Sequence, residues 1–113
     1  MHDRSCLGDR AHVYNLGEVE LAARATVAQE SYLCTGTHDF DEDGLPLVTA
    51  RIAIGEDSFL GARCFIMPGV KIGRGTIIGA CSVVTHDMPD WAICAGNPCK
   101  PIKKRMSPRM PEQ

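Results

Sequence analysis

Aromatic side chains are scarce in this chain: one Trp, two Tyr and three Phe make up 5% of its 113 residues. A core with so few large side chains must rely on many small or β-branched residues in a regular stack. No apolar run approaches the roughly 20 residues that a membrane-spanning helix needs. No basic segment followed by an apolar stretch marks a secretory signal at the N-terminus. We therefore expect a cytoplasmic protein that does not enter a membrane.

A strong net charge is also missing. The formal value of −2 excludes the large basic surface that nucleic-acid-binding proteins carry. The six cysteines form no CxxC pair, and without a secretory signal we expect free thiols that pack as small hydrophobic groups. Neither a P-loop nor a dinucleotide-binding glycine motif is present. His12, His38 and His86 lack the close spacing of zinc ligands, so we expect no metal site.

A six-residue repeat dominates what the sequence does contain. Branched aliphatic residues recur every six positions, and they are Ile54, Leu60, Ile66, Ile72, Ile78 and Val84. The residue after each is mostly small, which we expect to permit a turn there, and the fourth residue after each is small or β-branched. A fixed period of this kind predicts a single-stranded left-handed parallel β-helix, in which three short strands and three turns make a coil of about eighteen residues. Ile54 should therefore stack on Ile72, and Leu60 on Ile78.

The repeat changes phase at two places. Leu7 and Val13 are followed after eight residues by Leu21, so two extra residues lie near positions 15–18. Leu21, Val27 and Leu33 are separated from Ile54 by a larger slip, which predicts a protruding loop at about residues 39–51. We thus expect one all-β domain over residues 1–113. Its β-helix of about four coils covers residues 7–88, and a C-terminal cap with a short basic tail covers residues 89–113. Four coils bury little core, so an oligomer is expected.

Breaks in a repeat are where functional residues are expected. The first break contains the segment Thr-Gly-Thr-His-Asp at residues 35–39, where His38 precedes an acidic loop. Histidine titrates near neutrality, so His38 could accept a proton, although a surface histidine at a loop start would look the same. The second break is the turn at residues 96–98, followed by lysines that could meet phosphate groups or could form a solvated tail.

The repeat, the TGTHDF segment, the run IGEDSFLGARCFIMPGVKIGRGTIIGACSVVTHDMP and the closing AGNPCKPIK resemble the hexapeptide-repeat O-acetyltransferases. The resemblance runs from about Val13 to Arg105 and is strongest to the sugar-modifying branch, which includes the colanic acid, galactoside, maltose and nodulation acetyltransferases. It implies a homotrimer with active sites between subunits. It also implies acetyl-CoA as co-substrate, with no permanently bound cofactor, and a hydroxyl acceptor on a sugar or a similar xenobiotic.

The same resemblance assigns roles to individual residues. His38 matches the general base, which removes the proton of the acceptor hydroxyl as its oxygen attacks the thioester directly, with no covalent enzyme intermediate. Asn15 and Asp39 match the acceptor side. The positions that match acetyl-CoA contacts are Gly61, Ala62, Gly79, Ala80, Thr85, His86, Lys100 and Lys103.

The chain departs from the family pattern in three ways. Position 62 is Ala where the galactoside enzymes have Ser, and position 86 is His where Lys is usual. The chain is also shorter than its relatives at the N-terminus. An alternative is therefore a catalytically impaired β-helix scaffold or assembly module that has lost its N-terminal part. A γ-type carbonic anhydrase on the same fold would need three zinc-binding histidines and matches poorly.

Overall fold

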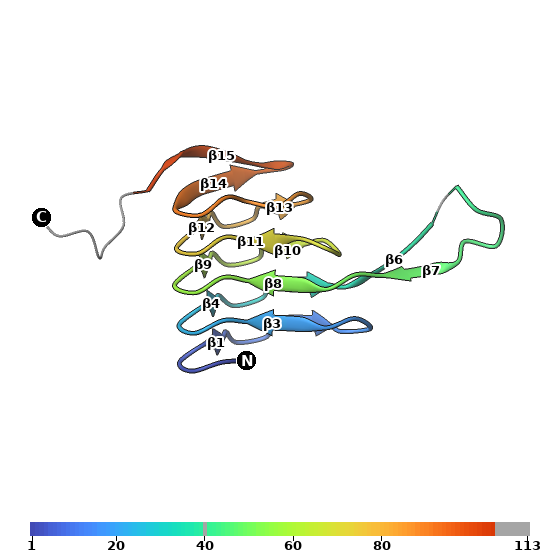
Figure 1. The fold of residues 1–113 in the computed structure, drawn as a ribbon, viewed down its shortest axis with the longest axis horizontal. Helices are drawn as coiled ribbons and strands as arrows, with labels where there is room; N and C mark the ends of the chain where they lie inside the picture. Colours follow the sequence, from blue (N-terminus) through green and yellow to red (C-terminus); the bar gives the residue numbers. More distant parts are fainter. Residues whose placement is uncertain (40, 106–113) are drawn as a thin grey trace, which may run out of the picture.

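A computed structural model describes residues 1–39 and 41–105 of the chain, and this part consists of short β-strands without a helix. Figure 1 shows the strands stacked in flat coils, with one hairpin projecting from the stack. The stack has three faces, each a separate sheet. Face A contains β1 (Cys6–Leu7), β4 (Thr26–Val27), β9 (Phe59–Leu60), β12 (Ile77–Ile78), β14 (Ala92–Gly96) and β15 (Cys99–Lys104). Face B contains β2 (His12–Tyr14), β5 (Tyr32–Cys34), β10 (Phe65–Ile66) and β13 (Val83–Val84). Face C contains β3 (Val19–Leu21), β8 (Ile52–Ile54) and β11 (Lys71–Ile72).

Successive coils pair in parallel with the register that the repeat predicts. Ile54 lies opposite Ile72, and Leu60 lies opposite Ile78, each pair eighteen residues apart. Across the first phase slip, Leu7 pairs with Val27, which is two residues more than one coil. The slip therefore lies between β2 and β3, at residues 15–18, as the spacing indicates.

Three kinds of turn join the faces, and we name them by the faces they connect. The A–B corner comprises residues 8–11, 28–31, 61–64 and 79–82; the B–C corner comprises 15–18, 67–70 and 85–87; the C–A corner comprises 22–25, 55–58, 73–76 and 89–91. From Leu21 onward the repeat aliphatics of all three faces are almost fully buried, as Leu60 and Ile66 show with no exposed surface, whereas Leu7 and Val13 in the first coil are partly buried. Buried hydroxyls at the corners are satisfied locally, since Ser58 and Ser82 donate to the carbonyls of Gly55 and Gly79 at 2.6 and 2.7 Å.

The turns use the backbone differently from the sequence expectation. We expected the small residue after each aliphatic to permit the turn. The left-handed backbone conformation instead occurs two residues after the small one, mostly at residues other than glycine. These positions include Arg10, Arg24, Glu30, Asp57, Arg63 and Cys81, with φ between 57° and 62°. The small residues are needed for another reason. A Cβ on Gly61 would lie 2.7 Å from the backbone nitrogen of Ala80 in the next coil.

The excursion at the second phase slip is an ordered hairpin. β6 (Gly36–His38) pairs antiparallel with β7 (Leu47–Thr49), and the Ala50 amide donates to the Thr35 carbonyl at its base. The sequence spacing places the protruding loop at residues 39–51, whereas the structure begins the excursion at Gly36 and places His38 within its first strand. The hairpin leaves the stack at the B–C corner, between β5 and β8 (Figure 1).

The C-terminal end of the stack is covered by a strand. β14 continues the parallel pairing of face A beyond residue 88, and β15 folds back antiparallel along it. Lys100, Lys103 and Lys104 therefore lie on a paired strand rather than on a free tail. Trp91 lies over Gly75, and the guanidinium of Arg105 lies 5.5 Å from the centre of the indole ring. The rest of the predicted tail, residues 106–113 with both of its prolines, lies outside the described residues.

Candidate functional site

His38 is exposed near the outer end of strand β6. Its Nδ1 lies 2.7 Å from the carbonyl oxygen of Leu45, across the hairpin. A carbonyl only accepts hydrogen bonds, so the neutral ring must carry its proton on Nδ1. The other ring nitrogen, Nε2, is then left with a free lone pair, which is the arrangement of a general base.

The loop beyond His38 is held by its own hydrogen bonds. The Asp39 amide donates to the Pro46 carbonyl at 2.9 Å, and the Asp39 carboxylate accepts from the Asp41 amide at 3.0 Å. Leu45 adopts a left-handed conformation with φ of 47°, which turns the chain so that its carbonyl faces His38. One carboxylate oxygen of Asp39 thus helps to shape the loop.

Thr35 fixes the base of the hairpin, and the sequence analysis did not single it out. It is fully buried. Its hydroxyl donates to the Tyr14 carbonyl at 2.6 Å and accepts from the Gly17 amide at 2.8 Å. These bonds tie the hairpin to residues 15–18 of the coil below, so Asn15 and His38 belong to the same corner of the stack. The TGTHDF segment contains this threonine, but its spacing does not reveal the contact with the first coil.

The A–B corner presents a column of small residues. Ala62 and Ala80 lie one coil apart in it, and the Ala62 carbonyl accepts from the Cys81 amide at 2.9 Å. Among residues 1–39 and 41–105, the amides of Ala62 and Ala80 have no hydrogen-bond acceptor. Gly61 and Gly79 precede them, and the missing side chain of Gly61 lets the backbone of the next coil approach closely. The corner therefore offers a narrow strip with two backbone donors to an extended ligand.

Charged residues flank this strip at the lower coils. Glu30 accepts from Arg63 and from Arg10, each at 2.7 Å. Hydrogen bonds from Arg63 and then Arg10 lower the pKa of the Glu30 carboxyl below its ordinary value of 4.5. Toward the C-terminal end, Lys100 pairs with Ala95, whose methyl group lies above Gly79. Lys100 therefore stands at the upper end of the same corner, and Lys103 is farther along face A, opposite Ile93.

Thr85 and His86 lie elsewhere. They belong to the B–C corner, where the Thr85 hydroxyl is 3.0 Å from the His86 ring nitrogen Nδ1. Apart from Lys103 on face A, the predicted site residues thus fall into two groups. Gly61, Ala62, Gly79, Ala80 and Lys100 lie at the A–B corner, while Asn15, His38, Asp39, Thr85 and His86 lie at or beyond the B–C corner.

One chain does not bring the two groups together. Ala62 and Met67 lie at different corners, with strand β10 (Phe65–Ile66) of face B between them. The hairpin with His38 projects away from the stack (Figure 1). The two groups therefore lie at opposite edges of face B.

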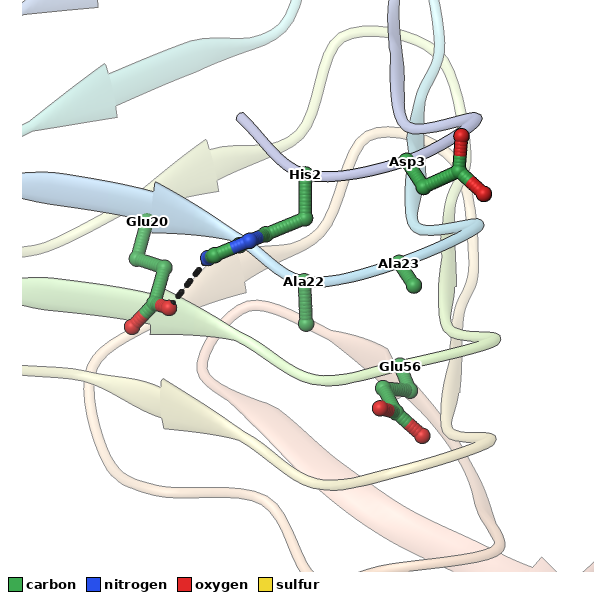
Figure 2. A pocket seen from close by; sticks show the side chains of 6 residues that line it. All are labelled: His2, Asp3, Glu20, Ala22, Ala23 and Glu56. Atoms are coloured by element: carbon green, nitrogen blue, oxygen red, sulfur yellow. Dashed lines mark hydrogen bonds and ion pairs between the residues drawn. The ribbon is translucent and has the colours of Figure 1, made fainter.

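A separate cavity of about 330 Å³ lies at the C–A corner near the N-terminus and includes none of the predicted site residues. Figure 2 shows its acidic lining, with His2 turned toward Glu20. The His2 Nε2 lies 2.6 Å from a Glu20 carboxylate oxygen, and this hydrogen bond, aided by Arg51, lowers the pKa of Glu20. The cavity lies at a different corner from the His38 hairpin, and no role in the chemistry of His38 follows from it.

The described residues contain no group of three or more His, Cys, Asp or Glu side chains arranged to hold a metal ion. Their six cysteines are all unpaired thiols. No helix within residues 1–39 and 41–105 is long and apolar enough to cross a membrane.

Comparison with protein families matches residues 51–86 to the bacterial transferase hexapeptide family, described as six repeats. The chain is similar to this family over those residues, which are about a third of its length. The match covers β8 to β13, the part of the stack that holds both Ala62 and Ala80. The family match and the solved relatives below together establish the fold as a left-handed parallel β-helix.

Curated proteins that are similar to this chain are acetyltransferases by name. One is the Escherichia coli (strain K12) protein WcaF, provisionally named a colanic acid biosynthesis acetyltransferase; it is 39% identical over 104 residues, which are 92% of this chain and 57% of the relative. Another is a chloramphenicol acetyltransferase of Klebsiella aerogenes, 50% identical over 54 residues, or 48% of this chain and 26% of the relative. The chain thus spans little more than half the length of WcaF.

Solved structures that are similar to this chain are also acyltransferases by name. The N-acyltransferase AntD of Bacillus cereus, solved with dTDP-4-amino-4,6-dideoxyglucose and coenzyme A, superimposes with a TM-score of 0.83 at 26% identity, covering 91% of this chain and 61% of AntD. A maltose O-acetyltransferase of Clostridium difficile 630 gives a TM-score of 0.79 at 26% identity, covering 92% of this chain and 60% of that chain.

Proposed function

We propose that this protein is an acetyl-CoA-dependent O-acetyltransferase that acts on a hydroxyl of a sugar or a similar small acceptor. The observation that carries the proposal is the hydrogen bond between His38 Nδ1 and the Leu45 carbonyl, which leaves Nε2 as a proton acceptor on an exposed hairpin. Relatives named as sugar or drug acetyltransferases support the reaction class.

The proposed reaction is a direct transfer. His38 Nε2 removes the proton of the acceptor hydroxyl as its oxygen bonds to the thioester carbonyl carbon. The tetrahedral oxyanion then collapses, the carbon–sulfur bond breaks, and the departing thiolate of CoA receives the proton from His38. Position 62 is Ala, so any donor to the oxyanion from this position is the backbone N–H rather than a side-chain hydroxyl.

The proposed donor site follows the A–B corner. The amides of Ala62 and Ala80, which lack acceptors among the described residues, suit the amide carbonyls of an extended pantetheine chain. Lys100 at the upper end of the corner, and Lys103 farther along face A, suit the phosphates of CoA as point charges. Thr85 and His86 would contact the donor only from a neighbouring chain, because they lie at the B–C corner.

Because the two groups of residues lie at different corners, the proposed active site is shared between two chains of a homotrimer. His38, with Asn15 and Asp39 on the acceptor side, comes from one chain, and Ala62 and Ala80 come from the next. Assembly is then a condition for turnover, and not merely for stability.

The test is release of the CoA thiol from acetyl-CoA with a panel of acceptors, namely maltose, galactose, chloramphenicol and an amino sugar. We expect turnover on a hydroxyl acceptor and a loss of about 100- to 10,000-fold in His38→Ala. His38→Gln keeps a donor for the Leu45 carbonyl but has no basic nitrogen, so it should lose as much. His2→Ala, another exposed histidine, is the control and should retain full activity.

The proposed enzymatic function would be refuted if no acceptor were acetylated and calorimetry detected no heat of acetyl-CoA binding. That result would favour the scaffold alternative. Transfer to the amino group alone would instead place the protein with N-acyltransferases such as AntD.

A further inference from the structure

Two irregular segments of the stack meet at the B–C corner. Residues 15–18 hold the extra residues of the first phase slip, and the hairpin of β6 and β7 leaves the stack one coil higher. Asn15, on the proposed acceptor side, lies in the first segment, and the proposed base His38 lies in the second. The parallel register of β2 with β5 ends at Tyr14 and Cys34, and the hairpin pairs antiparallel with itself. The relative position of the two segments therefore depends on contacts outside the regular parallel pairing.

Thr35 supplies these contacts. Its amide and its hydroxyl both donate to the Tyr14 carbonyl, at 3.1 and 2.6 Å, and the hydroxyl oxygen accepts from the Gly17 amide at 2.8 Å. The Thr35 carbonyl accepts from the Ala50 amide, at the far end of the hairpin, at 2.9 Å. Because Thr35 is fully buried, the loss of its hydroxyl would leave the Gly17 amide without this acceptor and without easy access to water. One residue thus links both ends of the hairpin to residues 15–18.

The contact is closely packed and belongs to this level of the stack. A Cβ on Gly17 would lie 3.3 Å from the Thr35 Cβ. Two residues beyond the register pairs of β5, β10 and β13, the positions equivalent to Thr35 are Pro68 and His86, which are half-buried and exposed. The buried hydroxyl therefore coincides with the departure of the hairpin rather than with the repeat.

We infer that Thr35 is a positioning residue for acetyl transfer, whose hydroxyl sets where Asn15 and its segment lie relative to His38. The inference rests on the proposed function for the roles of Asn15 and His38. Thr35 is fully buried, so it acts through the Tyr14 carbonyl and the Gly17 amide rather than on an acceptor itself. A shift of about 1 Å between acceptor and base can cost about 100-fold in rate, so a single buried contact of this kind has a measurable effect on catalysis.

The test compares two substitutions at Thr35 that each remove one group. Thr35→Val keeps the branched shape and removes the hydroxyl, whereas Thr35→Ser keeps the hydroxyl and removes the methyl group. We expect Thr35→Val to lower kcat/KM for the acceptor by about 10- to 100-fold. Its KM for acetyl-CoA should match wild type, because the proposed donor strip lies at the A–B corner. Thr35→Ser should retain the acceptor kinetics of wild type.

Thr76→Val is the control for lost stability. Thr76 is also fully buried, and its hydroxyl donates to the Pro89 carbonyl at the C–A corner, away from both groups of site residues. We expect Thr76→Val and Thr35→Val to unfold at similar urea concentrations, both below wild type. Only Thr35→Val should lose activity.

Hydrogen exchange gives a readout that does not need turnover. In Thr35→Val the backbone amides of residues 15–18 and those of β6 and β7 should exchange faster together, because the link between the two segments is lost. In Thr35→Ser both segments should keep the protection of wild type.

Equal losses of activity in Thr35→Val and Thr35→Ser, or an equal loss in Thr76→Val, would overturn the inference. Faster exchange confined to residues 15–18 would overturn it as well. If wild type transfers no acetyl group, the proposed function fails, and hydrogen exchange alone then upholds or overturns the link through Thr35. If Thr35→Val does not fold, Gly17→Ala replaces it, because its added Cβ presses on the Thr35 side chain from the other segment.

Discussion

Gly61→Ala should lower the free energy of unfolding, because the added methyl group would clash with the next coil of the stack. An added Cβ would lie 2.7 and 2.9 Å from the nitrogen and Cα of Ala80, which are backbone atoms that cannot rotate away. The coil that contains Gly61 and the next coil, which contains Ala80, would have to separate at the A–B corner. This would lengthen the hydrogen bond from the Gly61 amide to the Ile78 carbonyl, now 2.8 Å. Overpacking of this kind costs about 1–3 kcal/mol, and the lower entropy of an unfolded Ala returns roughly 0.4–1 kcal/mol. The net expectation is a loss of about 1–2 kcal/mol.

Gly79→Ala is the matched control, since it lies one coil higher in the same column. Its added Cβ would lie 3.2 Å from the Ala95 methyl group, with the nearest backbone atom, the Cys94 carbonyl oxygen, at 3.6 Å. A methyl group at this distance needs to move only slightly, so we expect a change within about 0.5 kcal/mol. Urea unfolding at a fixed protein concentration measures both variants. Equal midpoints for the two, or a Gly61→Ala variant more stable than wild type, would refute the reasoning.

The cysteines give predictions about reactivity and pH. Burial raises the pKa of the Cys99 thiol from its ordinary value of 9.0 to about 11, and burial also raises the pKa of Cys64 and Cys94. At pH 8 the thiolate fraction of Cys99 is then about 100-fold below that of an ordinary thiol. We expect a thiol-specific reagent to label exposed Cys6 and Cys81 first, whereas rapid labelling of all six would contradict the packing. Because the folded chain holds the Cys99 proton more tightly than the unfolded chain, the contribution of Cys99 to stability should be constant below pH 9 and fall between pH 9 and 11, which urea midpoints at each pH in this range would check.

The stack could be predicted from sequence because its determinants are local and repeated. Each coil has three inward positions, one on each face, and Ile54, Leu60 and Ile66 are examples of the residues that occupy them. One period therefore determines the register, the faces and the buried residues together. The two phase slips can be predicted for the same reason, because each changes the number of residues between successive repeat aliphatics.

The hairpin and the C-terminal strand were not visible in this way. Their pairings, Gly36 with Thr49 and Ala95 with Lys100, are antiparallel and depend on tertiary contacts rather than on the period. The support from Thr35 likewise comes from a carbonyl in another coil. The site residues were matched through family resemblance, and only the structure separates them into two corners.

The central claim is that an active site is made from two chains, and mixing two inactive variants tests it most directly. His38→Ala removes the base at one corner, and Ala80→Arg, at an exposed position, blocks the strip at the other corner. Each variant alone should be inactive. When equal amounts of the two variants are unfolded and refolded together, half of the chains keep His38 and the other half keep an open A–B corner. In a randomly assembled trimer, a quarter of the junctions combine an intact His38 from one chain with an open A–B corner from the next. The mixture should therefore recover roughly a quarter of wild-type acetyl transfer. A mixture that forms mixed trimers and stays inactive would contradict the shared site.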